Sequence, residues 1–122
     1  MKHISDHSHY RLNEVIALGE RSHGGIYYEY AIQRAHYSND STHNVGSIKF
    51  QKGIRGDYGV INGVSDIDLL EILKHRLVAF QRTSIASDEN DQALKHVEEA
   101  LFWLNKRMED RTKRGVIGMM DK

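Results

Sequence analysis

The pattern of apolar residues changes abruptly near residue 65, and this change limits the folds that the chain can adopt. Glycine, tyrosine and β-branched residues are frequent up to Val64, whereas Leu, Glu, Lys, Arg and Ala dominate beyond it. Glycine is absent between Gly63 and Gly115. The first set of residues favours strands and the second favours helices. We therefore predict an α+β fold with a small N-terminal antiparallel β-sheet followed by a long C-terminal antiparallel α-helical hairpin.

The first half contains two segments with the alternation that is typical of half-buried strands. These segments cover residues 26–33, where Ile26, Tyr28, Tyr30 and Ile32 share one face, and residues 47–51. We expect them to pair antiparallel across the polar connection at 37–44. Residues 10–18 fit either a short helix or a strand, and we favour a strand. Residues 59–64 are expected to be extended and to end in an Asn62-Gly63 turn, and residues 1–9 are expected to be frayed.

Two helices are predicted from 65 to 114, each with its own start signal. Ser65 and Ser87 are suitable N-caps, because each is followed by acidic residues in the first turn. The first helix should end near Gln81 or Arg82, and the second near Arg114, where Gly115 stops it. The apolar stripes are Leu70, Leu73, Leu77 and Phe80 in the first helix, and Leu94, Val97, Leu101, Leu104 and Met108 in the second. The short link predicts an antiparallel hairpin, with residues 115–122 as a tail.

The length of 122 residues allows one domain over residues 1–122, with residues 10–64 as its β-rich part. A helix over 88–114 is about 40 Å long, whereas a compact domain of this size is about 35 Å across. The last helical turns would therefore lack cover within one chain. We expect another copy of the chain to supply it.

Composition excludes several classes of function. Lys plus Arg and Asp plus Glu both number 17, so no net charge attracts DNA or membranes at long range. The lack of cysteine excludes disulfides, thiolate zinc sites and a cysteine nucleophile. No apolar run or signal-peptide core is present, which predicts a soluble protein of the cytoplasm. Neither the histidines nor the glycines at 53, 56 and 59 form a catalytic, metal or phosphate-loop motif, so we predict neither enzyme activity nor a cofactor or metal.

Arg107, Arg111 and Arg114 are spaced to share one face of the second helix, at the margin of its apolar stripe. Partly desolvated guanidinium groups bind phosphate more strongly than exposed ones do. The alternative is a solvated face with Glu109 and Asp110 as partners. Phe80 and Asn90 lie at the hairpin bend, where they can be an ordinary core residue and an ordinary helix-start residue. They can meet the arginines only if the bend of one hairpin faces the tail of another.

The order and spacing of several fragments resemble the Thoeris anti-defence family of phage proteins, first type, whose helical hairpin is shared with the anti-CBASS sponge family. The resemblance covers roughly residues 45–118. It rests on the segments 48–53, 59–64, 87–90 and 98–104, on Leu70, Leu73, Arg76-Leu77 and Phe80-Gln81, and on Arg107, Arg111, Arg114-Gly115-Val116 and Gly118.

The resemblance implies a non-catalytic protein that sequesters glycocyclic ADP-ribose, the signal made by TIR-domain enzymes, in the cytoplasm of a bacterial host. It also implies a dimer or hexamer with the ligand between subunits, and in some members cyclic di- or trinucleotides at a second site. By motif, Phe80 would stack on adenine and Asn90 would bond to ribose or base. Arg107 would cover the ring or reach a phosphate, and Arg111 would bind the pyrophosphate. Arg55 and Arg114 are further candidates.

Two other functions remain open from the sequence. A phage nucleic-acid-binding or assembly protein would use the C-terminal arginine face, and it would retain DNA in a salt-dependent manner. An enzyme that cleaves the signal would leave product rather than intact ligand after the protein is denatured.

Overall fold

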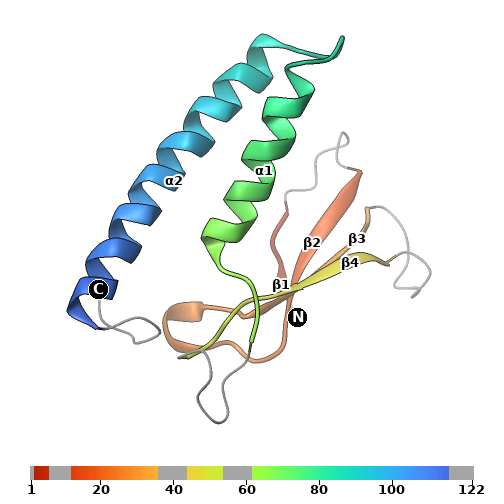
Figure 1. The fold of residues 1–122 in the computed structure, drawn as a ribbon. Helices are drawn as coiled ribbons and strands as arrows, with labels where there is room; N and C mark the ends of the chain where they lie inside the picture. Colours follow the sequence, from red (N-terminus) through yellow and green to blue (C-terminus); the bar gives the residue numbers. More distant parts are fainter. Residues whose placement is uncertain (1, 6–11, 36–43, 54–61, 116–122) are drawn as a thin grey trace.

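The computed structural model describes residues 2–5, 12–35, 44–53 and 62–115, and it confirms the α+β class with a sheet followed by a helical hairpin (Figure 1). The elements in chain order are β1 (Lys2–His3), β2 (Asn13–Leu18), the 3-10 turn η1 (His23–Gly25), β3 (Glu29–Arg34), β4 (Asn44–Lys49), α1 (Asp66–Phe80) and α2 (Asp88–Arg114).

The four strands lie in chain order, and all neighbours are antiparallel. The strand that we favoured for residues 10–18 is β2, and the predicted pairing across the polar connection is that of β3 with β4. Lys2 and His3 differ from the expectation of a frayed start. They pair with Ala17 and Ile16 of β2, and the Val15 N–H donates to the Ser5 hydroxyl oxygen at 2.8 Å. The strand pairing and the bond to Ser5 hold in place a segment whose side chains carry no strand signal.

The register places the large apolar residues of three strands on one face of the sheet. Val15 lies opposite Ile32, and Tyr30 lies opposite both Ala17 and Ile48. Because side chains alternate along a strand, the second face carries Glu14 and Gln33 instead, and the Gln33 amide donates to the Glu14 carboxylate at 2.6 Å. The apolar face is the one that faces the helices.

Two details of the predicted β-region are wrong. β3 begins at Glu29 rather than Ile26, because Gly24 and Gly25 take positive φ values and the Ser22 N–H donates to the Ile26 carbonyl at 2.8 Å, which holds the preceding residues in a loop. Asn62-Gly63 forms no turn of the hairpin type, because such a turn needs positive φ at both central residues and Gly63 has none. The chain instead runs beside β4, where Val64 pairs in parallel with Phe50.

The predicted helix signals are confirmed. Ser65 and Asp68 form a capping box, in which the Asp68 N–H donates to the Ser65 hydroxyl at 3.2 Å and the Ser65 N–H donates to the Asp68 carboxylate at 2.8 Å. Gln81 caps the C-terminal end of α1. Ser87 caps the start of α2, and Gly115, at φ 68°, ends it in the left-handed conformation.

The described segments bury few apolar side chains. These buried residues are Ile16, Ala17 and Ala35 in and beside the sheet, and Leu77 and Leu101 in the hairpin. No helix in the described segments is long and apolar enough to cross a bilayer.

Candidate ligand-binding cavity

A cavity of about 650 Å³ lies between the apolar face of the sheet and the adjacent ends of the two helices. It exists because α2 has 27 residues and α1 only 15, so the last turns of α2 extend past the start of α1. In Figure 1 the end of α2 lies at the level of the sheet, whereas the bend of the hairpin points away from both. Pockets for small ligands in proteins have volumes of this order.

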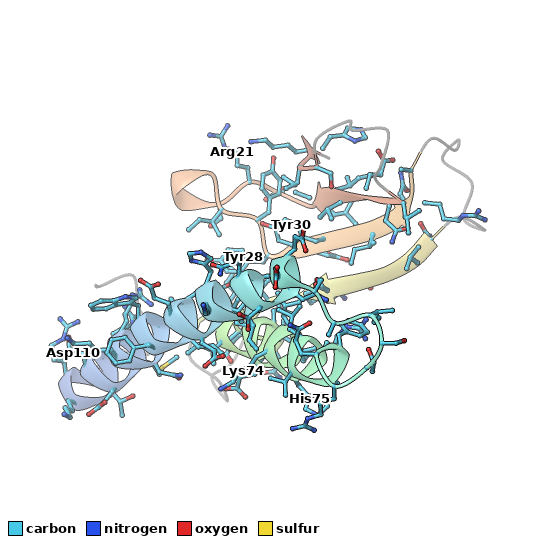
Figure 2. The ribbon with its side chains drawn as sticks, turned by 90° about the horizontal axis from the view of Figure 1, so that it is seen from above. Arg21, Tyr28, Tyr30, Lys74, His75 and Asp110 are labelled. Carbon is cyan, nitrogen blue, oxygen red and sulfur yellow. The ribbon has the colours of Figure 1, made fainter. Side chains whose placement is uncertain are left out.

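The sheet side of the cavity is aromatic. Tyr28, Tyr30 and Phe50 all line it, and the rings of Tyr30 and Phe50 meet edge to face with their centroids 5.7 Å apart. Tyr28 and Tyr30 are seen between the sheet and the hairpin in Figure 2. The ammonium of Lys52 lies 5.1 Å from the centre of the Tyr28 ring. We call Tyr28, Tyr30 and Phe50 the aromatic wall.

The helix side carries two of the predicted arginines. Arg107 and Arg111 line the cavity from the end of α2, together with Leu104 and Met108. Their spacing of four residues places them on one face of the helix. Arg111 is 5% exposed and Arg107 is exposed, so one guanidinium lies deep and the other at the rim. A buried and an exposed cation side by side suit a ligand with two neighbouring negative charges.

The third predicted arginine lies elsewhere. Arg114 does not line the cavity, and its guanidinium pairs with the Asp110 carboxylate at 3.5 Å on the outer side of α2. Beside it Lys113 pairs with Glu109 at 3.0 Å, and the hydrogen bond and charge of Glu109 raise the pKa of Lys113 above its usual value. The solvated face with acidic partners therefore describes Arg114, whereas Arg111 is buried.

Phe80 and Asn90 lie at the bend of the hairpin, far from the cavity of the same chain. Seventeen residues of helix separate Asn90 from Arg107, which is about 25 Å. The Arg76 guanidinium lies 5.2 Å from the centre of the Phe80 ring, and the Asn90 N–H donates to the Ser87 hydroxyl at 3.0 Å. The remaining candidate, Arg55, lies outside the described residues.

The aromatic wall is the part of the site that sequence reasoning missed. The alternation of Tyr28, Tyr30 and Ile32 did identify residues that share one face, but it could not identify what lies opposite them. Within the described segments, no three histidine or acidic side chains are grouped in a way that could hold a metal ion.

Comparison with known proteins agrees with this architecture. A family model described as the Acb2/Tad1 hairpin domain matches residues 43–109, just over half of the chain. A protein of Bacillus phage SBSphiJ7 named Thoeris anti-defense 1 is 39% identical over 83 residues, which are 68% of this chain and 58% of the phage protein. The chain thus matches less than two thirds of that relative's length. The matched region of the family model contains α1 and all of α2 up to Glu109, including Arg107 on the cavity wall. The chain belongs to the Acb2/Tad1 hairpin-domain family.

Proposed function

We propose that this protein binds glycocyclic ADP-ribose and keeps it from a Thoeris defence system in the cytoplasm of a bacterial host, without chemical turnover of the signal. The observation that carries the proposal is the cavity, in which Arg107 and Arg111 lie on one side and aromatic rings on the other. The proposed ligand is divided in the same way, because its pyrophosphate carries the negative charge and its adenine provides a flat apolar surface. The name of the similar phage protein supports the same biological role.

The affinity available to such a site suits sequestration. A ligand of about 35 non-hydrogen atoms at about −0.3 kcal/mol per atom gives about −10 kcal/mol, which is a dissociation constant of tens of nanomolar. A sequestering protein works by stoichiometry, so this affinity suffices without any turnover.

The geometry weighs against a protein that binds DNA through the C-terminal arginines. A DNA phosphate backbone needs cations that project together into solvent. Arg111 is 5% exposed and Arg114 is paired with Asp110, so the three arginines do not form one open basic surface.

We also propose that copies of the chain assemble, as a dimer or hexamer. Exposed apolar residues lie on both helices, including Ile72 at 57%, Phe102 at 60% and Trp103 at 56%. In such an assembly, Phe80 and Asn90 of one chain could approach the cavity of another.

Sedimentation velocity at micromolar concentration is expected to show an oligomer and little monomer. The physical reason is that large apolar side chains of both helices, Ile72, Phe102 and Trp103 among them, are more than half exposed, and contact with a second chain would remove them from water. A single species at the monomer mass across the concentration range would contradict the assembly, and with it the role of Phe80 and Asn90 in a shared site.

Phe80→Ala and Arg107→Ala are each expected to weaken binding of glycocyclic ADP-ribose by more than about tenfold, measured by calorimetry. The first removes a stacking surface and the second removes a cation that faces the phosphates. Lys113→Ala is the matched control for Arg107, because Lys113 lies on the same helix but pairs with Glu109 away from the cavity. If both test variants bind like the wild type, the proposed site is wrong.

The same titrations should include cyclic di- and trinucleotides, for which we propose a separate site on the assembly. After incubation, heat denaturation of the protein should release glycocyclic ADP-ribose intact. Recovery of a cleaved product would refute the non-catalytic role.

A further inference from the structure

The bend of the hairpin is closed by the side chain of one residue, Gln81. This residue is the C-cap of α1, and its amide group lies against the backbone of Ser87, the N-cap of α2. The Gln81 amide nitrogen donates to the Ser87 carbonyl oxygen at 2.9 Å, and the Ser87 N–H donates to the Gln81 amide oxygen at 3.0 Å. A residue pair in an antiparallel sheet exchanges two bonds in this way. We call this pair of bonds the Gln81 clasp.

No other hydrogen bond in the described bend, residues 80–90, joins the end of α1 to the start of α2. The Thr83 hydroxyl donates to the Phe80 carbonyl at 2.7 Å and accepts from the Ile85 N–H at 3.3 Å, so both of its bonds stay on the α1 side of the bend. The helices also meet through apolar side chains, but such contacts have little directional preference, whereas hydrogen bonds fix distance and angle. The clasp therefore sets how the end of α1 lies relative to the start of α2.

Both ligand residues that we propose at the bend adjoin the clasp. Phe80 directly precedes Gln81, and the Asn90 N–H donates to the Ser87 hydroxyl at 3.0 Å. Ser87 thus meets Gln81 through its backbone and Asn90 through its side chain. The ring of Phe80 is held from its own helix by Arg76, whose guanidinium lies 5.2 Å from the ring centre. A continuous set of hydrogen bonds therefore connects the end of α1 to Asn90.

We propose that Gln81 is a positioning residue, which holds Phe80 and Asn90 of one chain at the spacing at which they contact the signal together. This inference rests on the proposed function, in which these two residues approach the cavity of a neighbouring chain. With the clasp in place, the bend is ordered before the ligand arrives. Without it, the ligand has to order the bend, and the cost of this ordering lowers the affinity.

The clasp itself is tested without ligand. Gln81→Ala removes it, and so does Gln81→Met, which keeps most of the side-chain volume but has no amide. In both variants the Ser87 N–H loses its acceptor, so NMR should show its exchange with deuterium at least about tenfold faster. Thr83→Ala is the matched control, because it removes bonds of the same bend that do not reach α2. Unchanged Ser87 exchange in both Gln81 variants would contradict the clasp.

The positioning role is tested with two probes, glycocyclic ADP-ribose and inorganic pyrophosphate, on the full chain. Gln81→Ala and Gln81→Met should each weaken binding of glycocyclic ADP-ribose between about 5-fold and about 50-fold in calorimetry, the cost of ordering two released side chains. Binding of pyrophosphate, followed by ³¹P NMR, should not change, because pyrophosphate has no base or ribose for Phe80 and Asn90 to contact. Thr83→Ala should bind both probes like the wild type.

A double-mutant cycle shows whether Gln81 acts through its neighbours. In a chain that carries Phe80→Ala and Asn90→Ala, the groups that Gln81 positions are gone. Adding Gln81→Ala to this chain should therefore weaken binding of glycocyclic ADP-ribose by less than about 2-fold more. A full additional loss would mean that Gln81 acts independently of Phe80 and Asn90, and it would overturn the positioning role.

Each remaining outcome also decides a claim. If the wild type fails to bind glycocyclic ADP-ribose, the proposed function itself is wrong. If the wild type binds it and both Gln81 variants bind it equally well, the positioning role is wrong while the proposed function stands. An equal loss for both probes, or an equal loss in Thr83→Ala, would show a general loosening of the fold and would overturn the role too. Should Gln81→Ala fail to fold, Gln81→Met decides the question with the same probes.

Discussion

Arg111→Ala is expected to weaken binding of glycocyclic ADP-ribose by about 100-fold, the largest loss for any single side chain of the cavity. Arg111 is 5% exposed, so a phosphate bound at its guanidinium would meet little competition from water. A hydrogen bond to a charged group in such a place is worth about 1.5–3 kcal/mol, and the planar fork of arginine can make two of them to one pyrophosphate. Calorimetry measures the change.

Two companion variants make the Arg111 result specific. Arg111→Lys keeps the positive charge but loses the planar guanidinium that can donate two parallel hydrogen bonds. Its affinity should therefore fall between those of the wild type and the alanine variant. Arg114→Ala should bind like the wild type, because Arg114 pairs with Asp110 outside the cavity. Thermal unfolding of each variant checks that the buried position still folds. A folded Arg111→Ala protein with wild-type affinity would remove the phosphate role from this residue.

Gly63→Ala is expected to lower the free energy of unfolding by about 3 kcal/mol and to reduce ligand binding as well. A Cβ at this position would lie 2.6 Å from the Phe50 carbonyl carbon and 2.8 Å from the Gln51 nitrogen, and it would also meet the Lys49 carbonyl oxygen. These are backbone atoms and cannot rotate away. The chain before α1 would have to separate from β4, which would break the hydrogen bonds that Val64 makes with Lys49 and Gln51 at 2.9 and 3.0 Å.

Binding should suffer in the Gly63 variant because Phe50, Val64 and Ser65 all line the cavity. Gly46→Ala is the matched control, because a Cβ at Gly46 in β4 meets no heavy atom within 4 Å and its backbone conformation is open to any residue. Its unfolding free energy should change by less than about 0.5 kcal/mol. Denaturant unfolding at one fixed protein concentration compares the two. Equal stability of the two variants would contradict the close backbone approach at Gly63.

The hairpin could be predicted almost to the residue, because its boundaries depend on local chemistry. Ser65 and Ser87 each accept a hydrogen bond from a backbone N–H within their own first turn, and Gly115 ends α2 through its own φ angle. The spacing of Arg107 and Arg111 likewise fixes their shared face without reference to the rest of the chain.

The errors lie where distant segments meet. The start of β3 depends on the loop that Gly24 and Gly25 close, and the path of residues 62–64 depends on β4 beside them. The cavity could not be predicted for the same reason, because it forms between segments that are distant in the sequence. Alternation along β3 cannot reveal that the end of α2 lies across from Tyr30. The roles of Phe80 and Asn90 stay predictions, because contacts between chains would decide them.

Because α2 is longer than α1, a small tilt of α2 moves its unsupported end farther than the part that packs on α1. The last turns of α2 extend beyond the start of α1 (Figure 1), so that α1 does not support them. A tilt of a few degrees where the helices pack together moves the far guanidiniums by about an ångström or more relative to the sheet, since a displacement grows with distance from its pivot. Substitutions along the helix–helix contact can thus widen or narrow the cavity from a distance, and the fit for a ligand is adjustable without any change to the residues that touch it.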